Sequence, residues 1–126
     1  MIAIISTAHR EGTGAYVMLE YFLSAWERPH HELLIISPRD SRVGDAALAL
    51  GFPLLELVTS KDNFCGNLAS LFSRWNQLHP CRLVHAWHSR GLELAWATGL
   101  KLRVPVTATM HDPPDSPTHS RTRQMI

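Results

Sequence analysis

The sequence has no long hydrophobic segment. Its longest apolar runs, such as Met1–Ile5 and Leu33–Ile36, span only a few residues, whereas a membrane-spanning helix needs roughly 20. Met1–Ile5 is also too short for the hydrophobic part of a secretory signal, and no basic segment precedes it. We therefore expect a protein without a transmembrane segment that resides in the cytoplasm.

The sequence also lacks an excess of charge of either sign. Its 126 residues contain 12 Lys and Arg against 11 Asp and Glu, which gives a formal net charge of +1. This balance creates no extended field for nucleic acid or an anionic membrane, so we expect no nucleic-acid partner. A chain of this length corresponds to about one domain.

Signatures of metal and nucleotide binding are missing too. The two cysteines, Cys65 and Cys81, lack metal-ligand spacing and are expected to be buried, reduced thiols. The P-loop pattern G-x-x-x-x-G-K-[ST] does not occur. A dinucleotide fingerprint starting at Gly12 would require glycine or alanine at position 17, where Val17 stands. The sequence thus predicts neither a metal nor a bound cofactor.

The sequence does contain a regular alternation of short β-rich runs and helical stripes of apolar residues. Proline residues end two of the helical stripes, at Arg28-Pro29 and Pro80, and Gly51 is expected to cap another. This alternation is typical of an α/β protein with a parallel sheet and helices on both faces. The five β-rich runs are Ile2–Ile5, Leu33–Ile36, Pro53–Val58, Leu83–Trp87 and Val104–Met110.

We predict a Rossmann-like, three-layer α/β domain over residues 1–112, with strand order 3-2-1-4-5 and a loop or disordered tail at 113–126. The third run is the least uniformly apolar, so it is placed at an edge of the sheet. The first and fourth strands then flank the switch point of the sheet. Ligands of open α/β sheets bind there, outside the carboxyl ends of the strands.

The loop after the first strand carries the first group of candidate site residues. Gly12, Thr13 and Gly14 open the first helix, where glycines allow close approach and backbone amides favour an anion. His9 and Arg10 in the same loop are candidates for phosphate contact. The alternative interpretation of this segment is an ordinary βα turn.

The ends of the fourth and fifth strands carry the second group. His88 and Ser89 follow the fourth strand, and Ser89 can also cap the next helix. His111 can donate to an oxyanion, and Asp112 can hold its tautomer or act as a base; a solvated loop pair is the alternative. His85 is expected to be a packed, hydrogen-bonded histidine, because alternation along the strand separates it from His88.

The order and spacing of these pieces resemble the N-terminal domain of GT-B fold glycosyltransferases of the family 4 type. The resemblance rests on IAIISTAHREGTGAYVMLEYFL, HELLIISP and RLVHAWHSRGLELAWATGLKLRVPVTATMHD, and it covers residues 1 to about 114. It implies retaining transfer of a sugar from a nucleotide-sugar to an acceptor, without a cofactor. The donor-binding C-terminal domain of such enzymes is absent, so we expect this chain to be inactive without that domain or a partner chain.

The resemblance also implies roles for the candidate residues. Gly12, Thr13 and Gly14 would approach the donor diphosphate, while His111 would lie near the reaction centre with Asp112 supporting it. The implied acceptor-binding residues are His9, Arg10, His88 and Ser89.

Two other functional classes stay open. A non-catalytic interaction module would use an exposed sheet edge, or a face normally buried between domains, to bind a partner or to form a homo-oligomer. An NADP-binding protein would place Arg39, which follows the second strand, near the 2′-phosphate.

Overall fold

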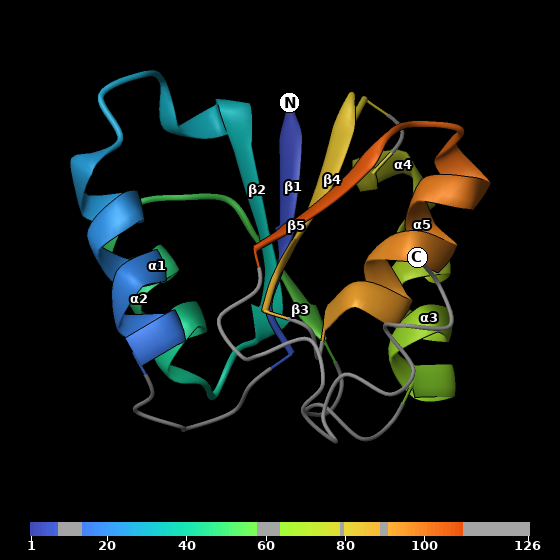
Figure 1. Cartoon of the computed structure of the whole chain (residues 1–126), viewed down its shortest axis with the longest axis horizontal. Helices are drawn as coiled ribbons and strands as arrows, with labels where there is room; N and C mark the ends of the chain where they lie inside the picture. Colours follow the sequence, from blue (N-terminus) through green and yellow to red (C-terminus); the bar gives the residue numbers. More distant parts are fainter. Residues whose placement is uncertain (8–13, 58–63, 79, 89–90, 110–126) are drawn as a thin grey trace.

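The computed structural model describes residues 1–7, 14–57, 64–78, 80–88 and 91–109. It contains a five-stranded sheet, and every neighbouring pair of strands is parallel (Figure 1). The sheet order is β3-β2-β1-β4-β5, so the predicted α/β fold and strand order are confirmed. The strands are β1 (Ile2–Ile5), β2 (Leu33–Pro38), β3 (Leu54–Leu57), β4 (Leu83–Trp87) and β5 (Val106–Thr109).

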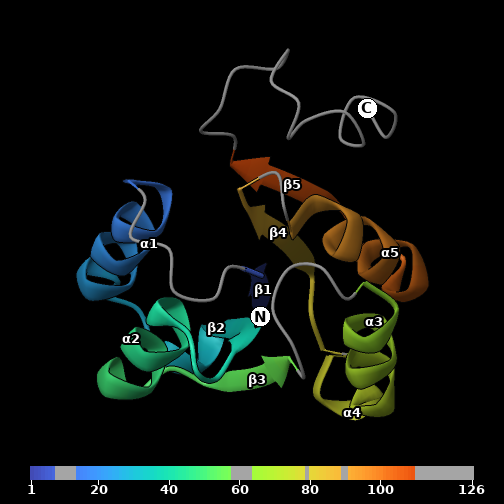
Figure 2. The ribbon, with the colours of Figure 1, turned by 90° about the horizontal axis from the view of Figure 1, so that it is seen from below.

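Helices cover both faces of the sheet, as Figure 2 shows. Helices α1 (Gly14–Ala25) and α2 (Arg42–Leu50) lie on one side. The other side carries α3 (Phe64–Ser73), α4 (Trp75–Leu78) and α5 (Leu92–Leu102). None of the helices within the described ranges is long and apolar enough to cross a bilayer.

The central strand β1 divides the hydrophobic core into two clusters. Ile4 packs with Leu19 and Leu23 of α1 in one cluster. Its neighbour Ile5 belongs to the other cluster, together with Leu71 of α3. Successive side chains of a strand point to opposite faces, so a strand with a helix layer on each side must be apolar throughout. The uniform Ile2–Ile5 run follows from this central position.

The ends of the helices differ in part from the sequence prediction. Gly51 caps α2 with a left-handed φ of 84°, as expected. The single helix expected before Pro80 is instead divided at Arg74, whose amide bonds to the carbonyl of Leu71 three residues earlier. This tighter, 3₁₀-type bond ends α3 before α4 begins. The N-cap of α5 is Gly91, and Ser89, which was predicted as a cap of this helix, lies outside the described residues.

The two cysteines differ in their surroundings. Cys81 is buried, as expected, and burial raises the pKa of its thiol. Cys65 is exposed, which contradicts the prediction that both thiols are buried. The helical spacing around Cys65 identified the helix correctly, but it did not determine which side of the helix meets the sheet.

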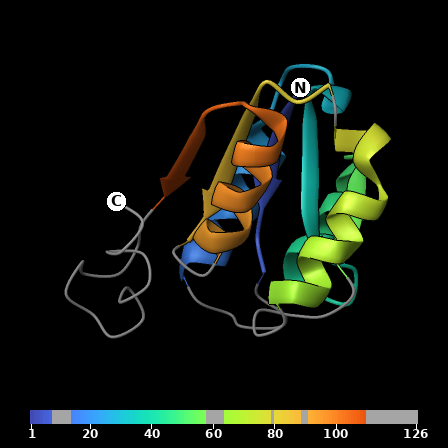
Figure 3. The ribbon, with the colours of Figure 1, turned by 90° about the vertical axis from the view of Figure 1, so that its right-hand side faces the viewer.

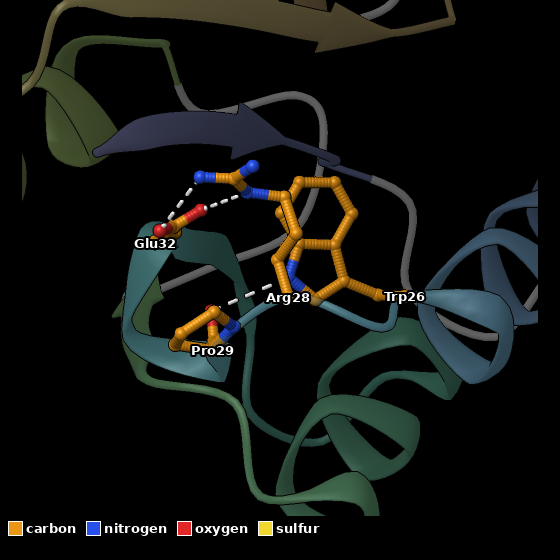
Figure 4. Close-up of polar contacts among 4 residues, drawn as sticks. All are labelled: Trp26, Arg28, Pro29 and Glu32. Atoms are coloured by element: carbon orange, nitrogen blue, oxygen red, sulfur yellow. Dashed lines mark hydrogen bonds and ion pairs between the residues drawn. The ribbon is translucent and has the colours of Figure 1, made fainter.

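The two edges of the sheet are formed by β3 and β5, and β5 stands at the outer side of α5 in Figure 3. At the amino ends of the strands, polar contacts hold the connection between α1 and β2 (Figure 4). Arg28 Nε donates to Glu32 Oε2 at 2.6 Å, and Trp26 Nε1 donates to the carbonyl of Pro29 at 3.3 Å. The hydrogen bond from Arg28 lowers the pKa of Glu32. These contacts lie far from the carboxyl ends of the strands, so they serve the fold.

Candidate functional site at the carboxyl end of β1

Two polar residues directly follow the central strand. Ser6 is fully buried, and Thr7 is 4% exposed. The backbone amide of Ser6 donates to the carbonyl of Ile36 at 2.9 Å, which extends the ladder between β1 and β2. Ser6 Oγ and Thr7 Oγ1 find no hydrogen-bond partner among the described residues. A buried hydroxyl without a partner costs about 1–3 kcal/mol, so these two atoms mark a place where a ligand is favoured.

The first turn of α5 begins beside this pair. A Cβ at Gly91 would lie only 3.1 Å from the carbonyl oxygen of Ile5, so glycine allows the helix to start against the end of β1. Gly91 is the N-cap of α5 and supplies no side-chain hydrogen bond to the first turn. The unpaired amides and the positive end of the dipole at a helix N-terminus attract anions and polar oxygens. The buried hydroxyls and this helix terminus therefore lie next to one another.

His88 follows β4 and lies beside the start of α5. It is buried, and its backbone has a positive φ of 83°, an uncommon conformation for a residue with a side chain. Its amide donates to the carbonyl of Thr109 at 2.9 Å, and its carbonyl accepts from the amide of Gly91 at 3.2 Å. Its ring lies 5.8 Å from the ring of Tyr16 in α1. His88 thus joins the ends of β4 and β5, the start of α5 and the first turns of α1.

The N-terminus of α2 has a different arrangement, because its own side chains close it. Ser41 Oγ accepts from the amide of Gly44 at 3.0 Å and is paired with Ser37 Oγ at 3.0 Å. Ser41 Oγ also donates to the carbonyl of Pro38. A terminus that is capped in this way has little remaining capacity for a ligand. The site is therefore confined to the ends of β1 and β4.

His85 in β4 is hydrogen-bonded through both ring nitrogens. Nδ1 lies 2.7 Å from Thr107 Oγ1, and Nε2 lies 2.6 Å from Thr109 Oγ1. The prediction of a hydrogen-bonded histidine is confirmed, and partial burial lowers the pKa of the ring. With both nitrogens bonded to threonine hydroxyls, His85 stabilises the pairing of β4 with β5 and stands apart from His88.

Two of the site residues predicted from the sequence fall within the described ranges. Gly14 begins α1, and His88 lies at the ends of β4 and β5 as described above. Ser6 and Thr7 were missed, although a polar pair directly after a buried apolar strand is a readable signal. The predicted site residues outside the described ranges are His9, Arg10, Gly12, Thr13, Ser89, His111 and Asp112.

No protein-family model, curated protein or solved structure matches this chain. Among the described residues, no group of three His, Cys, Asp or Glu side chains is arranged to hold a metal ion. The chemistry that the described site offers is hydrogen bonding by hydroxyls, by helix amides and by a buried imidazole. These groups suit an uncharged hydroxyl or an anionic oxygen of a ligand.

Proposed function

We propose that this chain is the acceptor-side, N-terminal domain of a retaining glycosyltransferase that moves a sugar from a nucleotide-sugar to an acceptor. The observation that carries the proposal is the buried hydroxyl pair of Ser6 and Thr7, unpartnered among the described residues at the switch point of the sheet. Ligands of open α/β sheets bind at this point. A sugar diphosphate supplies both hydroxyl groups and phosphate oxygens to satisfy these partners.

The proposal assigns a role to each end of the site. The N-terminus of α5 would stabilise oxygen atoms of the ligand, and His88 would line the acceptor cleft together with Ser89. Gly12, Thr13 and Gly14 would approach the donor diphosphate. Catalysis would rest on positioning and on electrostatic stabilisation of the phosphate leaving group.

The remaining assignments follow from the resemblance. His111 would stabilise charge at the transferring sugar, and Asp112 would orient His111. His9 and Arg10 would contribute to acceptor binding. A C-terminal domain or a partner chain would hold the donor, so the chain alone is expected to be inactive, and a cytoplasmic location would give it access to nucleotide-sugars.

The NADP-binding alternative receives less support. Arg39 follows β2, where a 2′-phosphate would be bound, but its Nη1 atom lies 3.1 Å from Glu56 Oε1 of β3. A 2′-phosphate would have to compete with that carboxylate and would meet its negative charge. The interaction-module alternative is supported by a separate feature, the edge strand β5, whose outer side pairs with no strand among the described residues.

The proposal is tested by recording amide shifts of the ¹⁵N-labelled chain during titration with UDP-glucose and with GDP-mannose. The largest shifts are expected at Ser6, Thr7, His88 and Gly91. A Ser6→Ala/Thr7→Val double variant should bind about five- to 150-fold more weakly, because two hydrogen bonds of about 0.5–1.5 kcal/mol each are lost. Thr98→Val is the matched control, since Thr98 Oγ1 already donates to the carbonyl of Leu94 at 2.7 Å.

Three outcomes would contradict the proposal or part of it. Absence of shifts at Ser6 and Thr7 with either nucleotide-sugar would remove its main support. Shifts around Arg39 on adding NADPH, with none from nucleotide-sugars, would instead favour the dinucleotide alternative. Sugar transfer by the isolated chain would show that no second domain is needed.

A further inference from the structure

β5 is an edge strand, and among the described residues no strand pairs with its outer side. The carbonyls of Pro105 and Thr109 accept from the amides of Val84 and His88 on β4. Backbone groups of alternate residues point to opposite sides of a strand, so Val106 and Ala108 direct their amides and carbonyls away from β4. An edge of this kind is a template for another strand. The four residues Val106–Thr109 carry no charge, so a common protection against strand addition is missing here.

An apolar groove lies beside this edge. Its volume is about 450 Å³, within the range of ligand-binding clefts. Trp96 and Leu100 of α5 form one wall, with 45% and 61% of their surfaces exposed. Val104 and Val106 form the other wall. A strand added to β5 would place every second side chain next to Val106, on the side of the sheet that α5 covers.

One of the residues that line this groove is cationic. Arg103 lines the groove, is exposed, and has no ion-pair partner among the described residues. It is the C-cap of α5 and has a left-handed backbone with a φ of 59°. This conformation costs an ordinary side chain roughly 1–2 kcal/mol. The rest of the lining is uncharged, so Arg103 gives the groove a preference for a carboxylate at one end.

We propose that β5 and the groove beside it receive an extended segment of a partner protein by strand addition. The segment pairs its backbone with Val106 and Ala108, places an apolar side chain between Trp96 and Val106, and brings a carboxylate to Arg103. Backbone bonds supply affinity in this mode of recognition, and the side-chain pockets supply specificity. The inference rests on the edge and the groove alone and is independent of the proposed glycosyltransferase site.

The test uses fluorescein-labelled hexapeptides of alternating valine and threonine, acetylated and amidated, with a glutamate at either the first or the last position. Binding to the full chain is measured by fluorescence anisotropy. One of the two orientations is expected to bind about fivefold more tightly than its glutamine analogue, the effect of an ion pair worth about 1 kcal/mol. N-methylation of the peptide amides that face β5 should abolish binding, whereas N-methylation of the alternate amides should not.

Variants of the protein distinguish a loss of peptide recognition in the groove from a loss of folding. Arg103→Gly fits the left-handed backbone and should keep the chain folded while removing the preference for glutamate. Arg103→Glu should reverse the preference in favour of a lysine-bearing peptide. Arg74→Glu makes the same change of charge on the exposed surface between α3 and α4 and should leave binding unchanged.

Several results would overturn the inference. These are the absence of peptide binding, binding that ignores the pattern of N-methylation, and a glutamate preference that survives in Arg103→Gly. If the chain dimerises in sedimentation experiments and the peptide does not reverse the dimerisation, a second copy of this chain occupies the edge instead. Loss of binding in Ser6→Ala/Thr7→Val would connect the peptide to the other site and would also contradict the inference.

Discussion

Replacing Thr7 by valine tests the central physical argument about the site. The two side chains have similar shape and are both β-branched, so the change removes a hydroxyl with little effect on packing or strand preference. Thr7 is 4% exposed, and its hydroxyl has no partner among the described residues. A buried hydroxyl that lacks a partner costs about 1–3 kcal/mol. Thr7→Val should therefore raise the free energy of unfolding of the unliganded chain by about 1–2 kcal/mol.

The same substitution at Thr98 provides the control. Thr98 is fully buried, but its Oγ1 atom donates to the carbonyl of Leu94 at 2.7 Å. A satisfied hydrogen bond contributes about 0.5–1.5 kcal/mol to stability. Thr98→Val should accordingly lower the free energy of unfolding by up to about 1 kcal/mol. The two variants are thus expected to have effects of opposite sign.

Urea denaturation followed by far-UV circular dichroism measures both changes, provided that the slope of unfolding free energy against urea concentration is the same for the parent and the variants. If Thr7→Val destabilises the chain as much as Thr98→Val does, the Thr7 hydroxyl has a partner, and the argument for a ligand at this position fails. If Thr7→Val is stabilising and also weakens binding of UDP-glucose, stability has been exchanged for function at this site, as is common at binding sites.

Three further predictions concern the rest of the molecule. A Cβ at Gly99 would overlap Val106 Cγ2, so Gly99→Ala should cost about 1–3 kcal/mol of stability through overpacking, partly offset by a gain of about 1 kcal/mol in helix propensity. Val106→Ala should relieve the overlap, so if the stability changes of the two single variants simply add in the double variant, this contact is refuted. Iodoacetamide should modify the exposed Cys65 in the native chain and the buried Cys81 only after unfolding; equal labelling by mass spectrometry would contradict this. Burial lowers the pKa of His85, so the contribution of the neutral ring to stability is complete above about pH 6.5 and is lost as the pH falls. The parent chain should therefore lose more stability than His85→Gln between pH 7.5 and pH 5.5. Parallel plots of unfolding free energy against pH for the two proteins would contradict this prediction.

The strand order could be predicted from the sequence because two simple rules constrain it. Buried parallel strands are continuously apolar, as in Ile2–Ile5, and right-handed crossovers limit the arrangements that four βα connections can adopt. Gly51 was predictable for a similar reason, since glycine suits the left-handed backbone after a helix. The strands and the helix cap depend on the local sequence, so a pattern of neighbouring residues is enough to detect them, and the crossover rule then limits the strand order.

The features that escaped prediction depend on contacts between distant segments. The N-cap of α5, Gly91, lies against the carbonyl of Ile5, a contact between segments far apart in the sequence. Cys65 meets solvent because the helix is turned so that other residues face the sheet. Ser6 and Thr7 stand in the sequence as a polar pair after an apolar strand, but the burial of their hydroxyls is visible only in the structure. Of the candidate site, the sequence therefore indicated the end of the sheet at which Ser6 and Thr7 lie, but it missed these two residues.

The central position of β1 also bears on how the chain folds during synthesis. The first strand to leave the ribosome pairs with β2 on one side and with β4 on the other, and Ile4 reaches His85 only after most of the chain has been made. Contacts between residues so far apart in sequence close slowly. Until Trp87 has emerged, one edge of the most apolar strand stays open, and a nascent chain in this state is prone to aggregate. Slow translation between β3 and β4 would therefore lengthen the period in which the chain depends on chaperones.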